Sequence, residues 1–232
     1  MTLRSLAIAA ALFVFGLSGA YAATSNDDHL LPVEEHGLAR DHPSAIYRKL
    51  WQRKLLVTPG NVARFAHIPG SNQTEVVVCI NRSNRVGGAY SITVTEASSS
   101  LWGCIRTADE KVTDPRSVHI RRCDAPFPDS TAVVIRNLWL AMLKQARPLS
   151  ERIIAVDSTS EIFSAMNAEG KVLEAEAPPF ESKNIDELER IGLLLLDYCD
   201  VRLDKRPELS REIEKRAARL LARVERSNSK RK

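Results

Sequence analysis

The sequence lacks the short motifs by which many enzymes are recognised. It has no Gly-x-x-x-x-Gly-Lys-Ser/Thr phosphate loop, no Gly-x-Ser-x-Gly nucleophile elbow, no His-Glu-x-x-His zinc motif and no calcium-binding loop. It contains no Cys-x-x-Cys pair either, which disfavours a thioredoxin-like redox protein and a zinc knuckle. Because carboxylate pairs and many Ser/His sites leave no such motif, these absences favour a non-catalytic protein but leave an enzyme as an alternative.

Long apolar runs are also missing once the N-terminus is passed. The longest aliphatic run, residues 191–196, is interrupted by Gly192 and is far shorter than the roughly 20 residues that cross a bilayer. At the N-terminus, Arg4 precedes an apolar segment over 6–19, and Ala20-Tyr21-Ala22 has the small-x-small pattern of a cleavage site. The sequence therefore predicts a cleavable signal peptide over 1–23 and a periplasmic or secreted protein.

Cysteine is scarce, and all of it follows the predicted signal peptide. An even number of cysteines in an exported chain is most simply explained by disulfides, so we expect two bridges among Cys79, Cys104, Cys123 and Cys199. Three connectivities are open. Every candidate partner of Cys199 lies far away in the sequence, so a bridge to it would tie a C-terminal helix to the preceding strand-rich region.

Hydrophobic periodicity predicts an α+β fold of one domain over 43–226, preceded by a flexible polar leader over 24–42 and followed by a disordered basic tail over 227–232. Helices are expected over 43–56, 131–147, 185–200 and 207–226, with the third as a central buried helix and Asn184 and Glu187 as its capping pair. An antiparallel sheet of about five strands is expected over 62–68, 75–82, 89–96, 101–107 and 117–122. A strand over 153–157 and a hairpin over 161–177 would form a small addition.

The candidate catalytic groups are acidic residues near the predicted hairpin and two histidines on predicted strands. Two acids on facing strands can act as proton donor and base in glycan hydrolysis, which makes Asp157, Glu161, Glu174 and Glu176 candidates. His67 or His119 could act as a general base if a carboxylate or hydroxyl faced it. A solvent-facing polar stripe explains the acids equally well, and an ordinary surface position explains the histidines better.

No cofactor is predicted. His29, His36 and His42 lie among acidic residues in the leader, and these are ligand types for zinc or copper. Their spacings of seven and six residues match no helix face and no tight chelate. A solvated linker is therefore the preferred interpretation of this segment, with metal capture as the alternative.

Positive charge is concentrated at the C-terminus. Residues 204–232 contain eleven basic and five acidic side chains, a net charge of about +6. An anionic partner would be bound by this end, and Lys230, Arg231 and Lys232 are the candidates. Nucleic acid is disfavoured as that partner, because no aromatic side chain follows Tyr198 to stack on bases.

These features favour an exported binding protein, an inhibitor or immunity-type partner of an envelope enzyme or effector. The expected partner is therefore another envelope or secreted protein. One alternative is an envelope hydrolase that acts on glycan or peptide through the acids of residues 157–176. A second is a structural or membrane-surface envelope protein that uses the basic helices for peripheral contact with lipid.

Overall fold

The computed structural model describes residues 28–33, 43–56, 61–70, 73–83, 88–105, 114–149, 159–180 and 182–229. The predicted signal peptide, the strand expected over 153–157 and the last three residues lie outside these ranges. Within them, no helix is both long and apolar enough to cross a bilayer.

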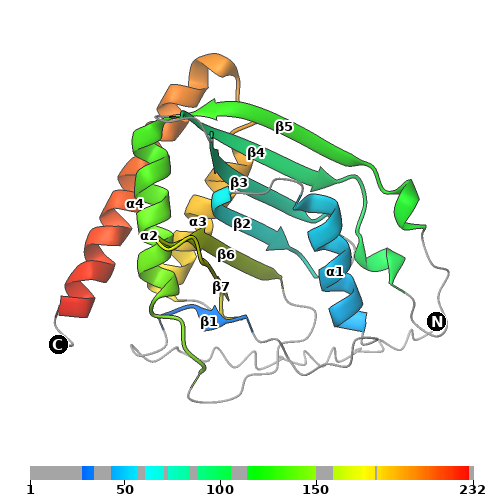
Figure 1. Cartoon of the computed structure of the whole chain (residues 1–232), viewed down its shortest axis with the longest axis horizontal. Coiled ribbons are helices and arrows are strands. Elements are labelled where there is room, and N and C mark those ends of the chain that lie inside the picture. The colour runs from blue at the N-terminus through cyan, green and yellow to red at the C-terminus, as the bar shows by residue number, and fades with distance from the viewer. Residues whose placement is uncertain are drawn as a thin grey trace, which may run out of the picture.

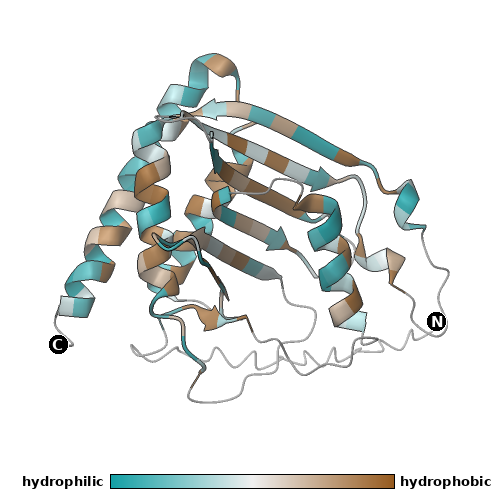
Figure 2. Ribbon diagram, viewed as in Figure 1, coloured by the Kyte–Doolittle hydropathy of each residue, from teal (hydrophilic) through white to brown (hydrophobic). Residues whose placement is uncertain are grey.

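The fold is α+β, as predicted, and its strands form one antiparallel sheet with the order β1-β7-β6-β2-β3-β4-β5. The strands are β1 (Leu31–Pro32), β2 (Asn61–Ile68), β3 (Val76–Arg82), β4 (Tyr90–Ala97), β5 (Ile120–Phe127), β6 (Ser160–Met166) and β7 (Val172–Glu176). The predicted hairpin is present as β6 and β7, and it extends the main sheet because β6 pairs with β2, so the described sheet has seven strands instead of about five. β3 lies inside the sheet between β2 and β4. It is predominantly brown in Figure 2 because most of its residues are hydrophobic, and residues on both of its faces are buried.

Helices cover both faces of this sheet (Figure 1). They are α1 (Pro43–Leu55), α2 (Asp129–Leu143), α3 (Lys183–Asp197) and α4 (Arg206–Ser229). On β2, Ala63 and Phe65 point to the core shared with α2, α3 and α4. Ala66 and Ile68 point to a second core under α1. This alternation along one strand separates the protein into two hydrophobic layers.

α1 docks on the sheet through its aromatic and leucine side chains. Trp51 is 2 % exposed, and the ring of Tyr47 makes an edge contact with Trp102 at 4.9 Å. The Tyr47 hydroxyl donates a hydrogen bond of 2.6 Å to the carboxylate of Glu75, which is fully buried. Burial and the neighbouring Glu75 carboxylate raise the pKa of Tyr47. These aromatic residues therefore serve the protein's own core.

The strand expected over 101–107 is wrong for residues 101–105, the part of it that the structure describes. Residues Trp102–Cys104 form a short 3₁₀ helix, η1, in which Ile105 donates its N–H to the Trp102 carbonyl. The N–H of Leu101 is withdrawn from strand pairing because it donates to both carboxylate oxygens of Glu75, at 3.0 and 2.9 Å. The last strand expected in this region is also displaced: it runs over Ile120–Phe127 instead of 117–122.

The flexible leader predicted over 24–42 does not hold for residues 28–33. β1 pairs with β7, and Leu30 is fully buried in the larger core. Asp28 caps α3: its Oδ1 accepts a 2.8 Å hydrogen bond from the N–H of Asn184 and another from the Ser182 hydroxyl. The predicted capping pair is therefore wrong, because the first turn of α3 is held by a residue far away in the sequence.

α3 is amphipathic, and the prediction of a central buried helix is wrong. Its apolar run is not buried all round, since Leu193 is 44 % exposed while Ile191 and Leu195 are fully buried. Gly192 lies against the ring of Phe65, and a Cβ added to it would be 2.8 Å from the ring carbons. The glycine within this apolar run therefore allows the helix to approach the sheet closely.

Candidate functional sites

An acid–histidine cluster lies where β2 and β6 meet α3. His67 and Glu161 are cross-strand neighbours, and His67 Nδ1 lies 3.1 Å from Glu161 Oε1. Glu189 reaches the cluster from α3. Burial, and then the carboxylates of Glu161 and Asp186, raise the pKa of Glu189 to about 7, against a smaller opposing effect of His67. A carboxyl group that holds a proton near neutral pH beside another carboxylate is the arrangement used by acid–base enzymes.

The acid–histidine cluster is not part of the depression found among the described residues. An open depression of about 480 Å³ is present near the start of α3, lined by Ser182, Lys183, Asp186, Glu187 and Arg190. Neither His67, Glu161 nor Glu189 lines it. The depression therefore does not bring a substrate to the raised-pKa carboxyl group.

Glu189 makes a testable contribution to stability against pH. Its pKa is higher in the folded chain than in the unfolded chain, so its contribution is fully present below about pH 4.5 and is lost as the pH rises through about 7. Glu189→Gln should remove this loss. We expect the difference in unfolding free energy, variant minus wild type, to rise by about 1–2 kcal/mol between pH 5 and pH 8, allowing for partial exposure. Urea unfolding at both pH values measures this difference in unfolding free energy. The exposed Glu225→Gln is the control, and its difference from the wild type should not change between the two pH values. An unchanged difference for Glu189→Gln would contradict the raised pKa of Glu189.

A row of polar side chains crosses the other face of the sheet, beneath and beside α1. Its members are direct cross-strand neighbours on six successive strands: Glu174, Ser164, Arg64, Cys79, Thr93 and Asp124. The middle of the row is buried, with Ser164 fully buried and Arg64 8 % exposed. Its ends are more open, since the side chain of Asp124 is 54 % exposed.

The charged groups of this row are engaged within the protein. Glu174 Oε1 forms an ion pair of 2.7 Å with Arg48 of α1, and Glu174 Oε2 is paired with Arg64. At the other end, Asp124 accepts a hydrogen bond of 2.6 Å from the Thr93 hydroxyl and forms an ion pair of 2.8 Å with Arg122. Glu174, a predicted catalytic acid, thus has both carboxylate oxygens held by arginine.

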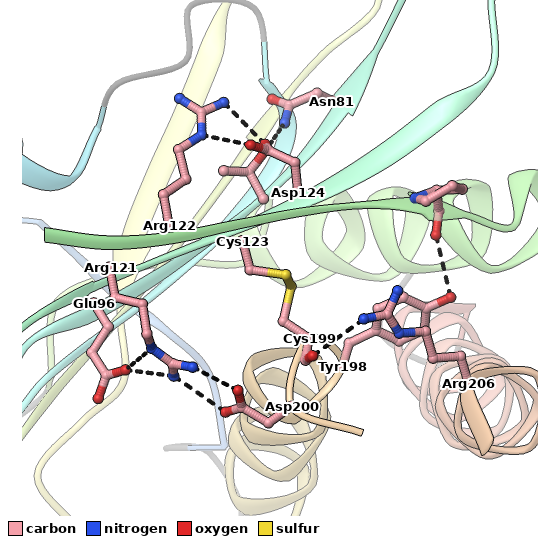
Figure 3. The surroundings of a disulfide bond; sticks show 12 residues. Asn81, Glu96, Arg121, Arg122, Cys123, Asp124, Tyr198, Cys199, Asp200 and Arg206 are labelled. Carbon is pink, nitrogen blue, oxygen red and sulfur yellow. Dashed lines mark hydrogen bonds and ion pairs between the residues drawn. A yellow bond between two sulfur atoms is a disulfide. The ribbon is translucent and has the colours of Figure 1, made fainter. Parts of the chain in front are cut away.

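The disulfide prediction is half correct. Cys123 of β5 is bonded to Cys199, just after α3, across a sequence separation of 76 (Figure 3). The bridge joins the end of α3 to an edge strand of the sheet, as the sequence predicts for a bridge to Cys199. Beside it, Arg121 forms ion pairs with Glu96 at 2.6 Å and with Asp200 at 2.7 Å, which adds a second link across the same junction.

Cys79 and Cys104 are free, so the second predicted bridge is wrong. Cys104 belongs to η1 and Cys79 to β3, and both are buried in the smaller core under α1. Burial raises the pKa of Cys79 to about 11 and also raises that of Cys104, so neither thiol is a ready nucleophile at neutral pH.

The remaining predicted site residues are scattered. Glu176 lies on β7 between the partners Leu31 and Ile162, and His119 is exposed ahead of β5. His29 is 2 % exposed beside the core, not in a solvated linker. The described residues contain no group of three His, Cys, Asp or Glu side chains placed to hold a metal ion. Asp157, His36, His42, Lys230, Arg231 and Lys232 lie outside the described residues.

The outer face of α4 carries a line of cations. Arg211, Lys215, Arg219 and Arg226 are exposed, and within the described chain none of them forms an ion pair with an acidic side chain. Arg211 and Arg226 hydrogen-bond only to backbone carbonyls of their own helix. We call these four residues the α4 basic stripe. Their helical spacing in the sequence places these four residues off the apolar face of the helix. The charge of residues 204–232 by itself instead favours the tail residues 230–232 as the binding candidates.

Comparison with known proteins identifies no relative: no family model, no curated protein and no solved structure matches the chain.

Proposed function

We propose that the chain is an exported binding protein that acts in the periplasm or outside the cell on another envelope or secreted protein, as an inhibitor or immunity-type partner. The observation that carries the proposal is that side chains suited to catalysis are engaged with one another. Both oxygens of Glu174 are paired with arginines, while the α4 basic stripe has no acidic partner among the described residues.

Engaged side chains favour binding over turnover because a general acid or nucleophile must be free to reach its substrate. Glu174 would have to leave two guanidinium groups before it could donate or accept a proton. The free thiols are buried and protonated at neutral pH. A disulfide-linked sheet, by contrast, is a rigid base on which a surface can be presented to a partner.

Export is supported by the sequence pattern of residues 1–23 and by the disulfide, which is stable in oxidising compartments. We expect the protein recovered from expressing cells to begin at residue 23 or 24. Intact-mass spectrometry of the extracellular and envelope fractions tests this directly. A chain that keeps Met1 and remains in the cytoplasm would contradict export.

The binding function is tested by capture from an envelope extract. The full chain, produced with its N-terminal segment, should form a complex of fixed stoichiometry that survives size-exclusion chromatography, and Glu161→Gln should leave that complex intact. Absence of any saturable complex would contradict the proposal.

A second candidate, an envelope hydrolase, is favoured by one observation: Glu189, with its raised pKa, lies beside the His67–Glu161 pair. It predicts turnover of cell-wall glycan or peptide that Glu161→Gln and Glu189→Gln both abolish. Turnover by the wild type with loss in both variants would establish this candidate instead. Glu225→Gln, at an exposed position on α4, is the matched control.

A further inference from the structure

The basic outer face of α4 is separate from the acid–histidine cluster and from the polar row. α4 packs against α2 and α3 through Ile213, Ala217, Leu220 and Val224, and its opposite side faces solvent. The stripe extends from Arg211 to Arg226, 15 helical steps or roughly 22 Å along the helix axis. α4 lies at the outer side of the helical layer, away from α1 (Figure 1).

The stripe stands out because other cations of α4 are paired. Arg216 binds Glu187 of α3 at 3.0 Å and Glu212 of its own helix at 2.6 Å. Arg223 donates to the side chain of Asn184. The stripe residues have no such contacts among the described residues, so their charge is available to a partner.

From this arrangement we infer that the α4 basic stripe is the surface that docks an acidic face of the partner protein. The inference rests on the proposed binding function and adds which surface is used and what chemistry it recognises. Arginine binds carboxylates through two parallel hydrogen bonds, and three of the four cations are arginines. Ala218 and Ala222, both exposed between them, let a partner approach the helix closely.

A lipid surface fits this face less well than a protein. Helices that bind membranes insert large apolar or aromatic side chains on the face that meets the lipid. The large apolar side chains of α4 point instead into the core, and the exposed residues between the cations are Ala218, Ala222 and Glu225. Glu208 and Glu225 are exposed near the two ends of the stripe. An anionic membrane would repel these carboxylates, whereas a protein whose acidic face is bordered by basic residues would not.

Titration of two defined probes tests the inference. Fluorescently labelled poly-L-glutamate represents an acidic protein surface, and vesicles of 30 % phosphatidylglycerol in phosphatidylcholine represent an anionic membrane. The wild-type chain should bind poly-L-glutamate more tightly than the vesicles, with an affinity that falls as NaCl rises from 50 to 300 mM. Tighter binding to the vesicles would overturn the inference in favour of a membrane-surface protein.

Charge reversal then locates the surface. The variant Arg211→Glu/Lys215→Glu/Arg219→Glu/Arg226→Glu should lower the affinity for poly-L-glutamate at least tenfold. A matched variant, Lys49→Glu/Arg53→Glu/Lys171→Glu/Lys183→Glu, changes net charge equally at four exposed cations elsewhere and should lower it less than threefold. Circular dichroism tests whether both variants are folded. If the stripe variant is not folded, the double variant Lys215→Gln/Arg219→Gln is used in its place, and its affinity for poly-L-glutamate should be at least threefold lower than that of the wild type. Equal losses in the stripe and control variants would overturn the inference.

The same variants separate this inference from the proposed function. If the complex captured from the envelope extract persists with the stripe reversed, the binding function stands and the stripe is not its surface. If the wild type forms no complex at all, the binding function itself fails.

Discussion

Loss of the Cys123–Cys199 disulfide is expected to lower the free energy of unfolding by about 4 kcal/mol. The bridge closes a sequence separation of 76, and in the chain-entropy model the restriction of the unfolded chain increases with the size of the closed loop. The bond also holds α3 to β5, an edge strand with a neighbouring strand on one side only. The double variant Cys123→Ala/Cys199→Ala, unfolded in urea, measures the effect.

The two free cysteines provide the matched control for this measurement. Cys79→Ala/Cys104→Ala also removes two thiols, but it should leave the response to reductant unchanged, because neither cysteine is bridged. Dithiothreitol should therefore destabilise the wild type and this control by the same amount, and should have no effect on the Cys123→Ala/Cys199→Ala variant. A reductant effect that persists in that variant would show that another bridge stabilises the fold.

Removal of Arg64 is expected to have the next largest effect, about 3 kcal/mol. The Arg64 side chain is 9 % exposed and pairs with Glu174, which is 22 % exposed, so Arg64→Met leaves a mostly buried carboxylate with one cation fewer. An uncompensated buried charge is costly, whereas a pair replaced as a whole often is not. Arg64→Met/Glu174→Gln should therefore recover part of the loss, and urea unfolding of the single and double variants measures the difference.

Two further substitutions, at Arg48 of α1 and at Ser164 of the row, act as controls. Arg48 contacts the same carboxylate, but its side chain is 31 % exposed, so Arg48→Met should cost about 1 kcal/mol or less. Ser164 is fully buried, and its hydroxyl has no hydrogen-bond partner among the described residues, so Ser164→Ala should be close to neutral. Equal losses for Arg64→Met and Arg48→Met would show that burial does not determine the strength of these ion pairs.

The acid–histidine cluster is only half visible in the sequence. From the sequence, His67 is a candidate general base only if a carboxylate faces it. Glu161 is a candidate catalytic acid only because it lies near the predicted hairpin. Their meeting depends on the pairing of β6 with β2, strands separated by more than 90 residues. Glu189 could not be picked out in the sequence, since its raised pKa arises from burial against that sheet.

The α+β class and the four helices, with their approximate ends, could be predicted from the amino-acid sequence alone. Apolar spacing and proline or glycine boundaries are local properties of the chain, and residues close in sequence establish them. The short turns between successive strands similarly required antiparallel pairing for β2, β3 and β4.

Contacts between residues far apart in the sequence could not be predicted and are seen in the folded chain. Folding joined the β6–β7 hairpin to β2, brought Asp28 to the start of α3 and bonded Cys199 to Cys123 while leaving Cys79 and Cys104 free. Each of these contacts depends on how whole elements pack their apolar faces together, and no local pattern encodes that choice. The same packing turned the apolar side of α4 inward and left its basic stripe facing solvent.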